Sequence, residues 1–379
     1  MFSEKLKILK EKRLFREIQD LASPQGSKVK FGEKEYINFS SNDYLGLSTH
    51  PYVIDRAKKA MDEYGYGSGA SRLLGGGSIL HKRLENKIAQ FKNTEAALIF
   101  NSGYSANTGI IPAITDADST ILSDELNHAS IIDGCRLSKA KTLVYRHKDL
   151  THLEELLKKE DARRKIIVTD TVFSMGGDIA PLEGIFDICK NYHAALYIDD
   201  AHGTGILGNG KGALSHFNIK PEPWIIQMGT FSKALGSFGA FIAGSSDVID
   251  WAINNARSFI FSTTLPPCIV AASTASLKLI EKDSELIKRL WANRNKVAHL
   301  LKDIGYDIMG SETPIVPIKT GTIENTLRIS RHLYEKGIFA PGIRPPTVKE
   351  PRIRITVTAA HTAEDIERLI NALKECKYM

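Results

Sequence analysis

The sequence lacks the features that mark secreted and metal-binding proteins. Its four cysteines are too far apart to form a C-x-x-C metal site or a disulfide framework: Cys135, Cys189, Cys268 and Cys376. We therefore expect no metal site and a cytoplasmic location, where thiols stay reduced. The first residues mix Lys and Glu, so neither a secretory signal nor an organelle transit peptide is predicted.

The sequence also lacks a block of one charge and a membrane-spanning run. The formal net charge is +6, yet the basic residues alternate with acids, as in residues 158–165, so no nucleic-acid partner is expected. Residues 258–277 carry no charge but contain Pro266-Pro267 and many hydroxyl groups, which excludes a membrane span. This stretch is better interpreted as a buried loop that leads into a helix.

What the sequence does contain is an alternation of strands and helices. With 42% hydrophobic and 25% charged residues, the composition is that of a globular protein. Short apolar strands are predicted at 96–100, 119–122, 142–145, 165–169, 195–198, 224–228 and 240–243, with helices between them. This pattern predicts an α/β fold with a mostly parallel sheet covered on both faces.

Three parts of the chain are expected. Residues 1–45 form an N-terminal segment, in which helical periodicity predicts an amphipathic helix from Glu4 to about Leu21 and a short hairpin follows. Residues 46–275 form the large α/β domain, and 276–379 a smaller C-terminal α+β domain.

The most informative segment surrounds Lys233, in Q-M-G-T-F-S-K-A-L-G-S-F-G-A (227–240). Thr230 lies three residues before the lysine, and small residues follow it. A lysine that forms a Schiff base needs a neutral amine and room for a flat cofactor. A lysine in such a segment, seen alone, is more often a solvated loop residue.

A second segment supplies the partner of that lysine. The apolar strand at 195–198 ends in Asp199, Asp200 and His202, at the edge where an open α/β sheet binds ligands. A carboxylate there can pair with the protonated ring nitrogen of pyridoxal 5'-phosphate (PLP), which also needs a lysine. A D-D-A-H string alone is equally compatible with a metal-site fragment or a helix cap. Together, Asp199 and Lys233 favour a PLP site.

Of three glycine-rich segments, one suits a phosphate. Residues 205–212 resemble a P-loop but have Gly212 where Ser or Thr is required, and the glycines from Gly65 follow a helix instead of a strand. In contrast, Gly103 and Tyr104 directly follow the strand at 96–100 and start a helix. The free N–H groups of a helix N-terminus bind phosphate, so these two amides are the predicted phosphate site.

The ordered motifs resemble those of the α-oxoamine synthase family of fold-type I PLP enzymes, over nearly the whole chain. They include N-F-S-S-N-D-Y-L-G-L (38–47), S-G-Y-S-A-N (102–107), L-N-H-A-S-I-I-D-G (126–134), I-D-D-A-H-G-T-G (198–205), G-T-F-S-K (229–233), F-S-T-T-L-P-P (261–267), I-R-P-P-T-V (343–348) and R-I-R-I-T-V-T-A-A-H (352–361). The I-R-P-P-T-V segment is most similar to the branch that makes 8-amino-7-oxononanoate.

The resemblance implies a role for each matching residue. Lys233 would carry PLP, Asp199 would pair with its ring nitrogen, and His202, with Ser174 nearby, would reach its phenolic oxygen. His128 would lie over the ring and orient the substrate. Gly103, Tyr104 and Thr230 would hold the phosphate, and Thr263 and Thr264 would reach it from the other subunit of a homodimer. Arg354 with Asn42 would bind the carboxylate of the amino acid, and Thr347 would contact the acyl substrate.

The implied reaction is the decarboxylative condensation of L-alanine with a pimeloyl thioester, carried by CoA or an acyl-carrier protein. A second possible activity within the same family is the condensation of glycine with acetyl-CoA. A hypothesis of a different kind is that the chain is a noncatalytic scaffold that has kept the fold. Two departures from the family pattern concern Gly176, where an aspartate is usual, and Gln19, where many relatives have a second basic residue after Leu14-Phe15-Arg16.

Overall fold

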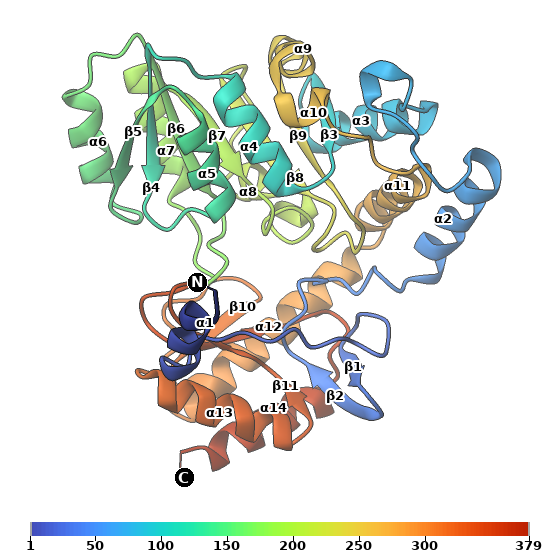
Figure 1. Cartoon of the computed structure of the whole chain (residues 1–379), viewed down its shortest axis with the longest axis vertical. Coiled ribbons are helices and arrows are strands. Elements are labelled where there is room, and N and C mark those ends of the chain that lie inside the picture. Colours follow the sequence, from blue (N-terminus) through green and yellow to red (C-terminus); the bar gives the residue numbers. More distant parts are fainter. Residues whose placement is uncertain (1, 378–379) are drawn as a thin grey trace. The chain divides into compact units, whose positions relative to one another are not determined.

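The computed structural model describes residues 2–377 and divides into two compact units (Figure 1). The first, called the sheet unit, contains His50–Ser174 and Ile179–Ile287. The second, called the terminal unit, contains the chain up to Thr49, the short segment Met175–Asp178 and the chain from Lys288 onward. The terminal unit therefore combines three segments that are far apart in the sequence.

The sheet unit is built on a seven-stranded sheet with the order β3-β9-β8-β7-β6-β4-β5. Its strands are β3 (Ala96–Phe100), β4 (Ser119–Asp124), β5 (Lys141–Tyr145), β6 (Arg164–Asp170), β7 (Ala195–Asp199), β8 (Ile225–Thr230) and β9 (Ala240–Gly244). The strand β9 runs antiparallel to β8 and β3, and the other pairs are parallel. The predicted α/β class with a mostly parallel sheet is confirmed.

Helices surround this sheet, and their ends follow local signals. They are α2 (Pro51–Tyr64), η1 (Arg72–Leu74), α3 (Ile79–Lys92), α4 (Gly103–Ala113), α5 (Ala129–Leu137), α6 (Leu150–Lys158), α7 (Leu182–Tyr192), η2 (Gly208–Gly210), α8 (Ala213–His216), α9 (Ser246–Asn255), α10 (Arg257–Ile260) and α11 (Pro267–Lys282). Ser102 and Ser245 cap α4 and α9, because each side chain accepts a hydrogen bond from a backbone N–H of the first turn.

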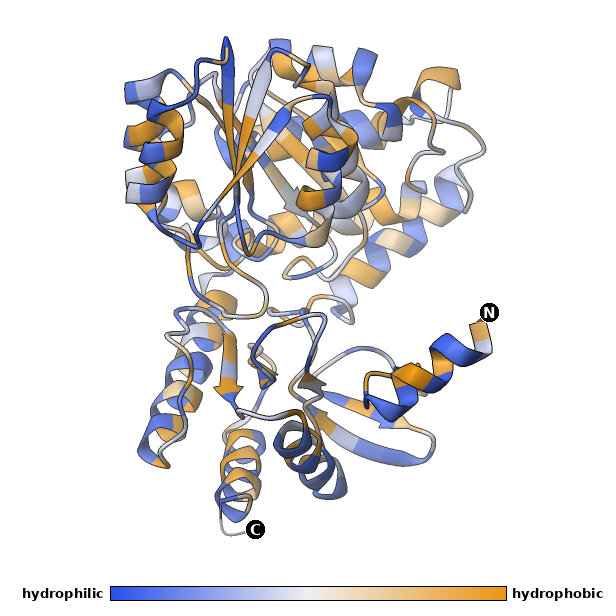
Figure 2. Ribbon diagram, turned by 60° about the vertical axis from the view of Figure 1, so that its left-hand side comes forward, coloured by the Kyte–Doolittle hydropathy of each residue, from blue (hydrophilic) through white to orange (hydrophobic). Residues whose placement is uncertain are grey.

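The core of the sheet unit lies between the sheet and its helices. Ile110 of α4 and Ile131 of α5 pack with Tyr197, Met228 and Ile242 of the strands, and all five are buried. The helices carry hydrophobic and hydrophilic residues on different faces (Figure 2). Burial of one apolar face per helix is what stabilises this layered arrangement.

Carboxylates gather at the edge where the parallel strands end. Asp124 ends β4, Asp170 ends β6 and Asp199 ends β7, and all three are buried. Asp170 and Asp199 are partners in the register of β6 and β7. Because parallel strands end at the same edge, their last side chains come together, and this edge is where such sheets bind ligands.

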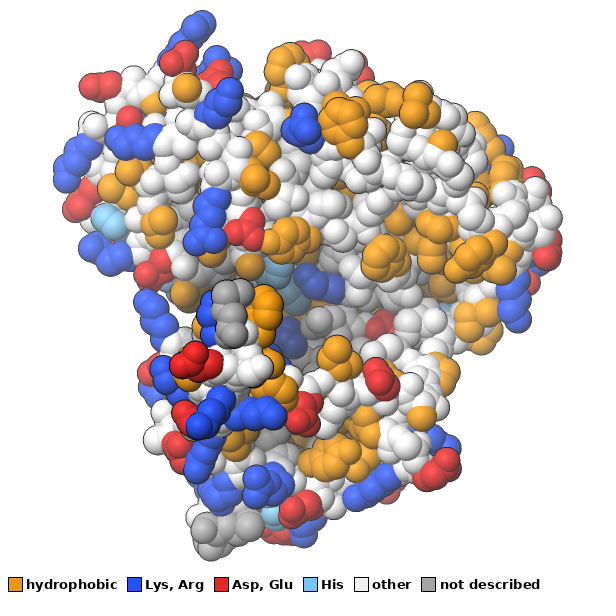
Figure 3. Space-filling model, viewed as in Figure 1, with side chains coloured by type: hydrophobic (Ala, Val, Ile, Leu, Met, Phe, Trp, Pro, Cys, Tyr) orange, Lys and Arg blue, Asp and Glu red, His pale blue; other side chains and the backbone are white. Residues whose placement is uncertain are grey.

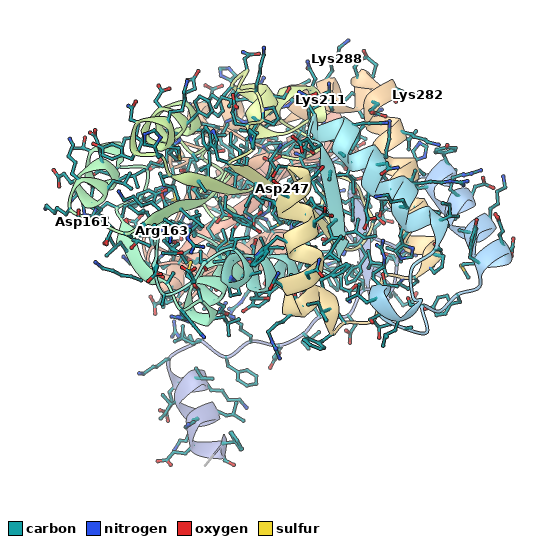
Figure 4. The ribbon with its side chains drawn as sticks, turned by 90° about the horizontal axis from the view of Figure 1, so that it is seen from above. Asp161, Arg163, Lys211, Asp247, Lys282 and Lys288 are labelled. Atoms are coloured by element: carbon teal, nitrogen blue, oxygen red, sulfur yellow. The ribbon has the colours of Figure 1, made fainter. Side chains whose placement is uncertain are left out.

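A buried ion pair stabilises the chain that follows β7. Asp200 Oδ2 lies 2.7 Å from Lys92 Nζ, and the two side chains are 1% and 0% exposed. The hydroxyls of Thr171 and Thr204 donate to the same carboxylate at 2.7 and 2.8 Å. Lys92 also donates to the carbonyl oxygen of Lys211, a residue labelled in Figure 4, at 2.8 Å. Asp200 thus has a structural role.

Within residues 2–377, the terminal unit contains two three-stranded sheets, a short N-terminal helix and three further helices. The sheets are β1 (Lys28–Phe31), β2 (Lys34–Asn38) and β11 (Ile338–Phe339), and β10 (Ile315–Lys319), β13 (Arg352–Thr356) and β12 (Gly342–Ile343). The further helices are α12 (Ser284–Asp303), which starts in the sheet unit, α13 (Ile323–Glu335) and α14 (Ala363–Glu375). Val297, Ile329 and Ile366 of these helices share a core with Ile318 and Ile353 of the strands.

The N-terminal helix is shorter than predicted. Periodicity predicts a helix to about Leu21, whereas α1 covers only Phe2–Glu11 and buries no residue. Arg13 adopts a left-handed φ of 56°, which interrupts the helix. The chain beyond is held by Arg344, whose guanidinium donates to the carbonyl oxygens of Arg13 and Phe15 at 2.8 and 2.9 Å. These tertiary hydrogen bonds replace the helical ones.

Within residues 2–377, no helix is both long enough and apolar enough to cross a membrane. The charge-free stretch at 258–277 contains the end of α10, an irregular segment and the beginning of α11.

The ion pair of Lys92 generates the first prediction. Lys92→Met should lower the free energy of unfolding by about 3–5 kcal/mol, because Asp200 would stay buried without its cation. Lys59→Met is the control, since Lys59 forms an exposed pair with Asp55 and should cost less than about 1 kcal/mol. Denaturant unfolding of both variants measures the difference. If both variants lost the same free energy of unfolding, burial of the Lys92–Asp200 pair would not explain its contribution to stability.

Candidate functional site

Lys233 lies in a tight loop between β8 and β9 of the sheet unit. The N–H of Phe231 donates to the carbonyl of Gly239 at 2.9 Å, and the hydroxyl of Thr230 donates to the same oxygen at 2.8 Å. Gly239 has a φ of 101°, and a Cβ there would lie 2.7 Å from Leu265 Cδ1. The glycine is therefore required, and the loop holds the half-buried Lys233 at the carboxyl edge of the sheet.

Asp199 ends β7 with a buried and hydrogen-bonded carboxylate. Its Oδ1 accepts the backbone N–H of Ala201 at 3.0 Å, and its Oδ2 accepts Nδ2–H of Asn107 at 2.8 Å. The side chain is 4% exposed. These two donors hold the carboxylate in one orientation.

His128 is the N-cap of α5 and lies close to both residues. Its backbone N–H donates to Asp170 Oδ2 at 2.6 Å, and its ring Nδ1 lies 2.7 Å from Ser130 Oγ. Burial lowers the pKa of His128, the nearby Asp199 carboxylate raises it, and the Lys233 amine lowers it again. The ring is therefore neutral at pH 7, and Asp199 and Lys233 are both within its electrostatic reach.

The pKa of Asp170 is affected by the same neighbouring residues, Asp199, His128 and Lys233. Burial and the Asp199 carboxylate raise the pKa of Asp170 well above its usual range, while the N–H of His128 and the Lys233 amine lower it. The structure therefore brings Lys233, Asp199 and His128 together from three separate segments. A site with two acids, one amine and a neutral imidazole can hold a cationic ring and move a proton.

The predicted phosphate site is the N-terminus of α4. Gly103 and Tyr104 occupy its first two positions, while the cap residue Ser102 accepts the N–H of Ser105 at 3.1 Å. The first N–H groups of a helix have no partner within the helix, so the amides of Gly103 and Tyr104 can bind an anion. The exposed Tyr104 ring donates its hydroxyl to Asp133. A Cβ at Gly103 would make only an ordinary contact, 3.5 Å from Met228 Cε.

The remaining predicted residues of this unit surround the same strand ends. His202 and Thr230 are buried just after β7 and at the end of β8. Ser174 is half-buried at the end of the segment that follows β6. Thr263 and Thr264 lie before α11, where the carbonyl of Thr263 accepts Nδ2–H of Asn101 at 2.7 Å.

Three predicted residues lie in the terminal unit. Arg354 of β13 is 8% exposed, and its guanidinium donates to Thr356 Oγ1 at 2.8 Å and to Asn42 Oδ1 at 3.1 Å. Asn42 and Arg354 are therefore brought together within the terminal unit. Thr347 Oγ1 accepts a hydrogen bond from Arg16 Nη2 at 2.7 Å.

The loop around Gly176 belongs to the terminal unit as well. The carbonyl of Met175 accepts Nη1–H of Arg352 at 3.0 Å, and that of Gly177 accepts the hydroxyl of Thr313 at 2.9 Å. A Cβ at Gly176 would lie 2.2 Å from Asp178 Oδ1, so an aspartate here would force that side chain to turn away. Glycine suits this conformation of the loop.

Sequence reasoning missed four residues that contact the predicted ones. Asp170 immediately follows a predicted strand, the same signal that singled out Asp199. Asn107 lies four residues after Gly103, so it shares a face of the helix with it. Ser130 carried no signal of its own, and Arg16 was noted only within the Leu14-Phe15-Arg16 pattern, because their contacts depend on segments far away in the sequence.

The chain is similar to known proteins over most of its length. The model of the family "Aminotransferase class I and II" matches residues 34–373. An 8-amino-7-oxononanoate synthase of Thermoanaerobacter pseudethanolicus is 45% identical, over 98% of this chain and 95% of its own.

Two solved structures extend this likeness. A serine palmitoyltransferase from S. paucimobilis with bound PLP and myriocin is 26% identical, with a TM-score of 0.93 over 100% of this chain and 96% of its own. An 8-amino-7-oxononanoate synthase from Francisella tularensis is 29% identical, with a TM-score of 0.80 over 90% of this chain and 98% of its own.

Proposed function

The chain belongs to the aminotransferase class I and II family, and we propose that it condenses L-alanine with a pimeloyl thioester to give 8-amino-7-oxononanoate, with loss of CO₂ and the thiol. It is a PLP-dependent acyltransferase of the same group as its relatives. We propose the substrates, the residue roles and the place in biotin synthesis together. The electrostatic influence of Lys233 on His128 and the hydrogen bonds of Asp199, Arg354 and Arg16 support them.

PLP is the cofactor of this enzyme, and the donor set of the sheet unit fits it. A buried carboxylate, a lysine within electrostatic reach and a helix N-terminus are the three groups that PLP needs. When bound, PLP supplies an aldehyde that combines with amines and a ring that withdraws electrons. We assign Lys233 to the aldehyde, Asp199 to the ring nitrogen, and the amides of Gly103 and Tyr104 to the phosphate.

Five further residues complete the cofactor assignment. His202 and Ser174 are assigned to the phenolic oxygen of PLP, and Thr230 to its phosphate. Thr263 and Thr264 are assigned to the phosphate bound by a second copy of the chain.

Lys233, Asp199 and His128 have separate roles in proton transfer and in orienting the substrate. Lys233 Nζ removes the Cα proton of alanine, and a lysine that serves as a base must be neutral when it does so. The carboxylate of Asp199 would stabilise the positive charge on the protonated ring nitrogen of PLP. The neutral ring of His128 orients the substrate without adding a second charge beside Lys233.

Arg354 is assigned to the carboxylate of alanine. Its guanidinium is already held by Thr356 and Asn42, so little conformational entropy is lost when an anion binds. Burial lowers the pKa of Arg354, and the nearby Tyr44 hydroxyl raises it. An arginine nevertheless keeps its charge in proteins, so it can pair with a carboxylate.

The hydrogen bond between Arg16 and Thr347 is the observation that favours a pimeloyl over an acetyl group. Thr347 is the residue assigned to the acyl chain, and the cation of Arg16 lies 2.7 Å from it within the terminal unit. A pimeloyl group ends in a carboxylate that an arginine can bind, whereas an acetyl group has none. Arg16 can therefore supply the charge that Gln19 does not.

We also propose that the chain works as a homodimer in the cytoplasm. Large apolar side chains are exposed on the face of the sheet unit that Figure 3 shows, on the side where α2 lies. The exposed apolar residues of this unit include Leu74 (81% exposed), Tyr66 (74%), Phe261 (71%) and Leu73 (54%). A patch of this kind usually marks a protein interface. The four cysteines are all free and buried, which suits a reducing compartment.

Lys233→Ala tests the assignment of the amine. The variant should lose the visible colour that bound PLP gives the protein, and its turnover should fall by at least about 10³-fold, because both the attachment and the base are removed. Absorption spectra and thiol release measure the two effects. Lys278→Ala, which removes an exposed lysine of α11, should change neither. Normal turnover by Lys233→Ala would reject the assignment.

A thiol-release assay tests the substrates. Wild-type enzyme should use alanine with pimeloyl-CoA better than glycine with acetyl-CoA. Arg16→Ala should raise KM for pimeloyl-CoA by about 10–100-fold, as expected for a lost hydrogen bond to a charged group worth about 1.5–3 kcal/mol. The KM for heptanoyl-CoA, which has the same length without the carboxylate, should not change.

Arg13→Ala is the matched control for this assay, since Arg13 lies on the same segment but pairs with Glu324. A preference for glycine and acetyl-CoA would replace the proposed function by the alternative one. An equal change of KM for both long acyl chains would reject the role of Arg16.

Sedimentation tests the dimer. The wild type should sediment at twice the chain mass of 41.9 kDa, and Leu74→Glu should weaken the association by placing a charge in the apolar patch. Leu137→Glu, at an exposed position of α5, should leave it intact. A monomeric wild type at micromolar concentration would contradict the proposal.

A further inference from the structure

A chain of buried hydrogen bonds connects Asp199 to His128 through Asn107. The amide Nδ2 of Asn107 lies 2.8 Å from Asp199 Oδ2 and 2.8 Å from Ser130 Oγ. Its Oδ1 accepts the hydroxyl of Tyr197 at 2.7 Å. Ser130 Oγ in turn lies 2.7 Å from His128 Nδ1. Asn107 and Tyr197 are 0% exposed and Ser130 is 1% exposed, so water does not compete for these bonds.

The surrounding groups determine which way the amide of Asn107 points. An ionised carboxylate can only accept hydrogen bonds, so the NH₂ group must face Asp199. The carbonyl oxygen then faces Tyr197, whose hydroxyl keeps its proton because burial raises the pKa of Tyr197 well above its usual range. The amide therefore donates both of its hydrogens, one to Asp199 and one to Ser130.

This orientation continues to the imidazole. The hydroxyl of Ser130 has one hydrogen and two lone pairs, so accepting from Asn107 leaves its hydrogen available for Nδ1 of His128. The backbone N–H of Ser130 also donates to Nδ1, at 3.3 Å. Nδ1 is thus an acceptor, and burial keeps the pKa of His128 below its ordinary value, so the ring is neutral at pH 7. A neutral imidazole that accepts at Nδ1 carries its proton on Nε2.

Close packing of two helices makes the chain possible. A Cβ at Gly134 of α5 would lie 2.7 Å from the carbonyl oxygen of Asn107 and 3.0 Å from Ile111 Cδ1. Glycine at this position therefore allows α5 to approach α4, which brings Ser130 to Asn107. The backbone of His128 is held separately by Asp170.

We propose that Asn107 is a positioning residue that orients Asp199 and, through Ser130, fixes His128 as the tautomer with its proton on Nε2. The value of this tautomer for the reaction rests on the proposed function, in which Asp199 faces the ring nitrogen and His128 faces the substrate. With the proton on Nε2, His128 is a hydrogen-bond donor at that atom, suited to a carbonyl or carboxylate oxygen. It cannot act there as a base.

Nitrogen NMR of the full-length chain, labelled at histidine and recorded at pH 8 with and without PLP, tests the inference. The signals of His128 are identified by their loss in His128→Gln. In the wild type, Nε2 should carry the proton and Nδ1 should not. Asn107→Asp, which is nearly isosteric, should move the proton to Nδ1, because the new carboxyl oxygen takes the hydroxyl hydrogen of Ser130 and leaves a lone pair facing the ring.

A second set of variants decides the case if Asn107→Asp does not fold. Ser130→Ala should lose the single tautomer, and Ser130→Thr should keep it because the hydroxyl is retained. Ser276→Ala is the matched control, since Ser276 is equally buried and its hydroxyl has no hydrogen-bond partner in the described structure. It should leave the signals of His128 unchanged.

A wild-type His128 protonated on Nδ1 would overturn the inference, as would an unchanged tautomer in folded Asn107→Asp or in Ser130→Ala. The spectra recorded without PLP need no catalysis. If the enzyme did not condense alanine with pimeloyl-CoA, the proposed function would be refuted. The NMR test of the His128 tautomer would still be valid.

Discussion

The buried ion pair between Lys92 and Asp200 is the interaction on which the site depends. It attaches the end of α3 to the chain that leaves β7, and the two threonine hydroxyls complete the hydrogen bonding of the carboxylate. Burying either charge without its partner would strongly destabilise the fold. The loop after β7 must therefore keep the geometry that brings Asp200 to Lys92. Successive residues at a strand end point to opposite sides. Once Asp200 is held by Lys92, Asp199 is directed toward Asn107.

The adjacent acids therefore have different roles although their residue type is the same. Asp200 is satisfied by a cation and hydroxyls of the protein, and it leaves no acceptor for a ligand. Asp199 is held by one amide side chain and one backbone N–H. Its environment also includes Asp170, whose pKa is raised well above its usual range by burial and then by the Asp199 carboxylate. The carboxylate of Asp199 at this edge suits a cationic ring.

Much of the fold could be predicted because its signals are local. The seven apolar runs became seven strands, since runs of that length between turn residues bury well in a sheet. The N-terminal helix was overestimated, because Arg344 from the far end of the chain binds the carbonyls of Arg13 and Phe15. Tertiary bonds of this kind override helical periodicity and leave no pattern in a short stretch of sequence.

The sequence by itself determined which residues could do chemistry: Lys233 among small residues, Asp199 at a strand end and the helix start at Gly103. Their motifs are local: the lysine and the aspartate are needed for their side chains, whereas the helix start at Gly103 supplies backbone N–H groups. Only the tertiary structure showed that Asp200 forms a buried ion pair with Lys92. It also decided that Asn107 of α4 contacts Ser130, next to His128, and that Arg16 reaches Thr347. Those choices depend on packing between distant segments, as at Gly134 and Asn107, where the absence of one Cβ sets the distance between two helices.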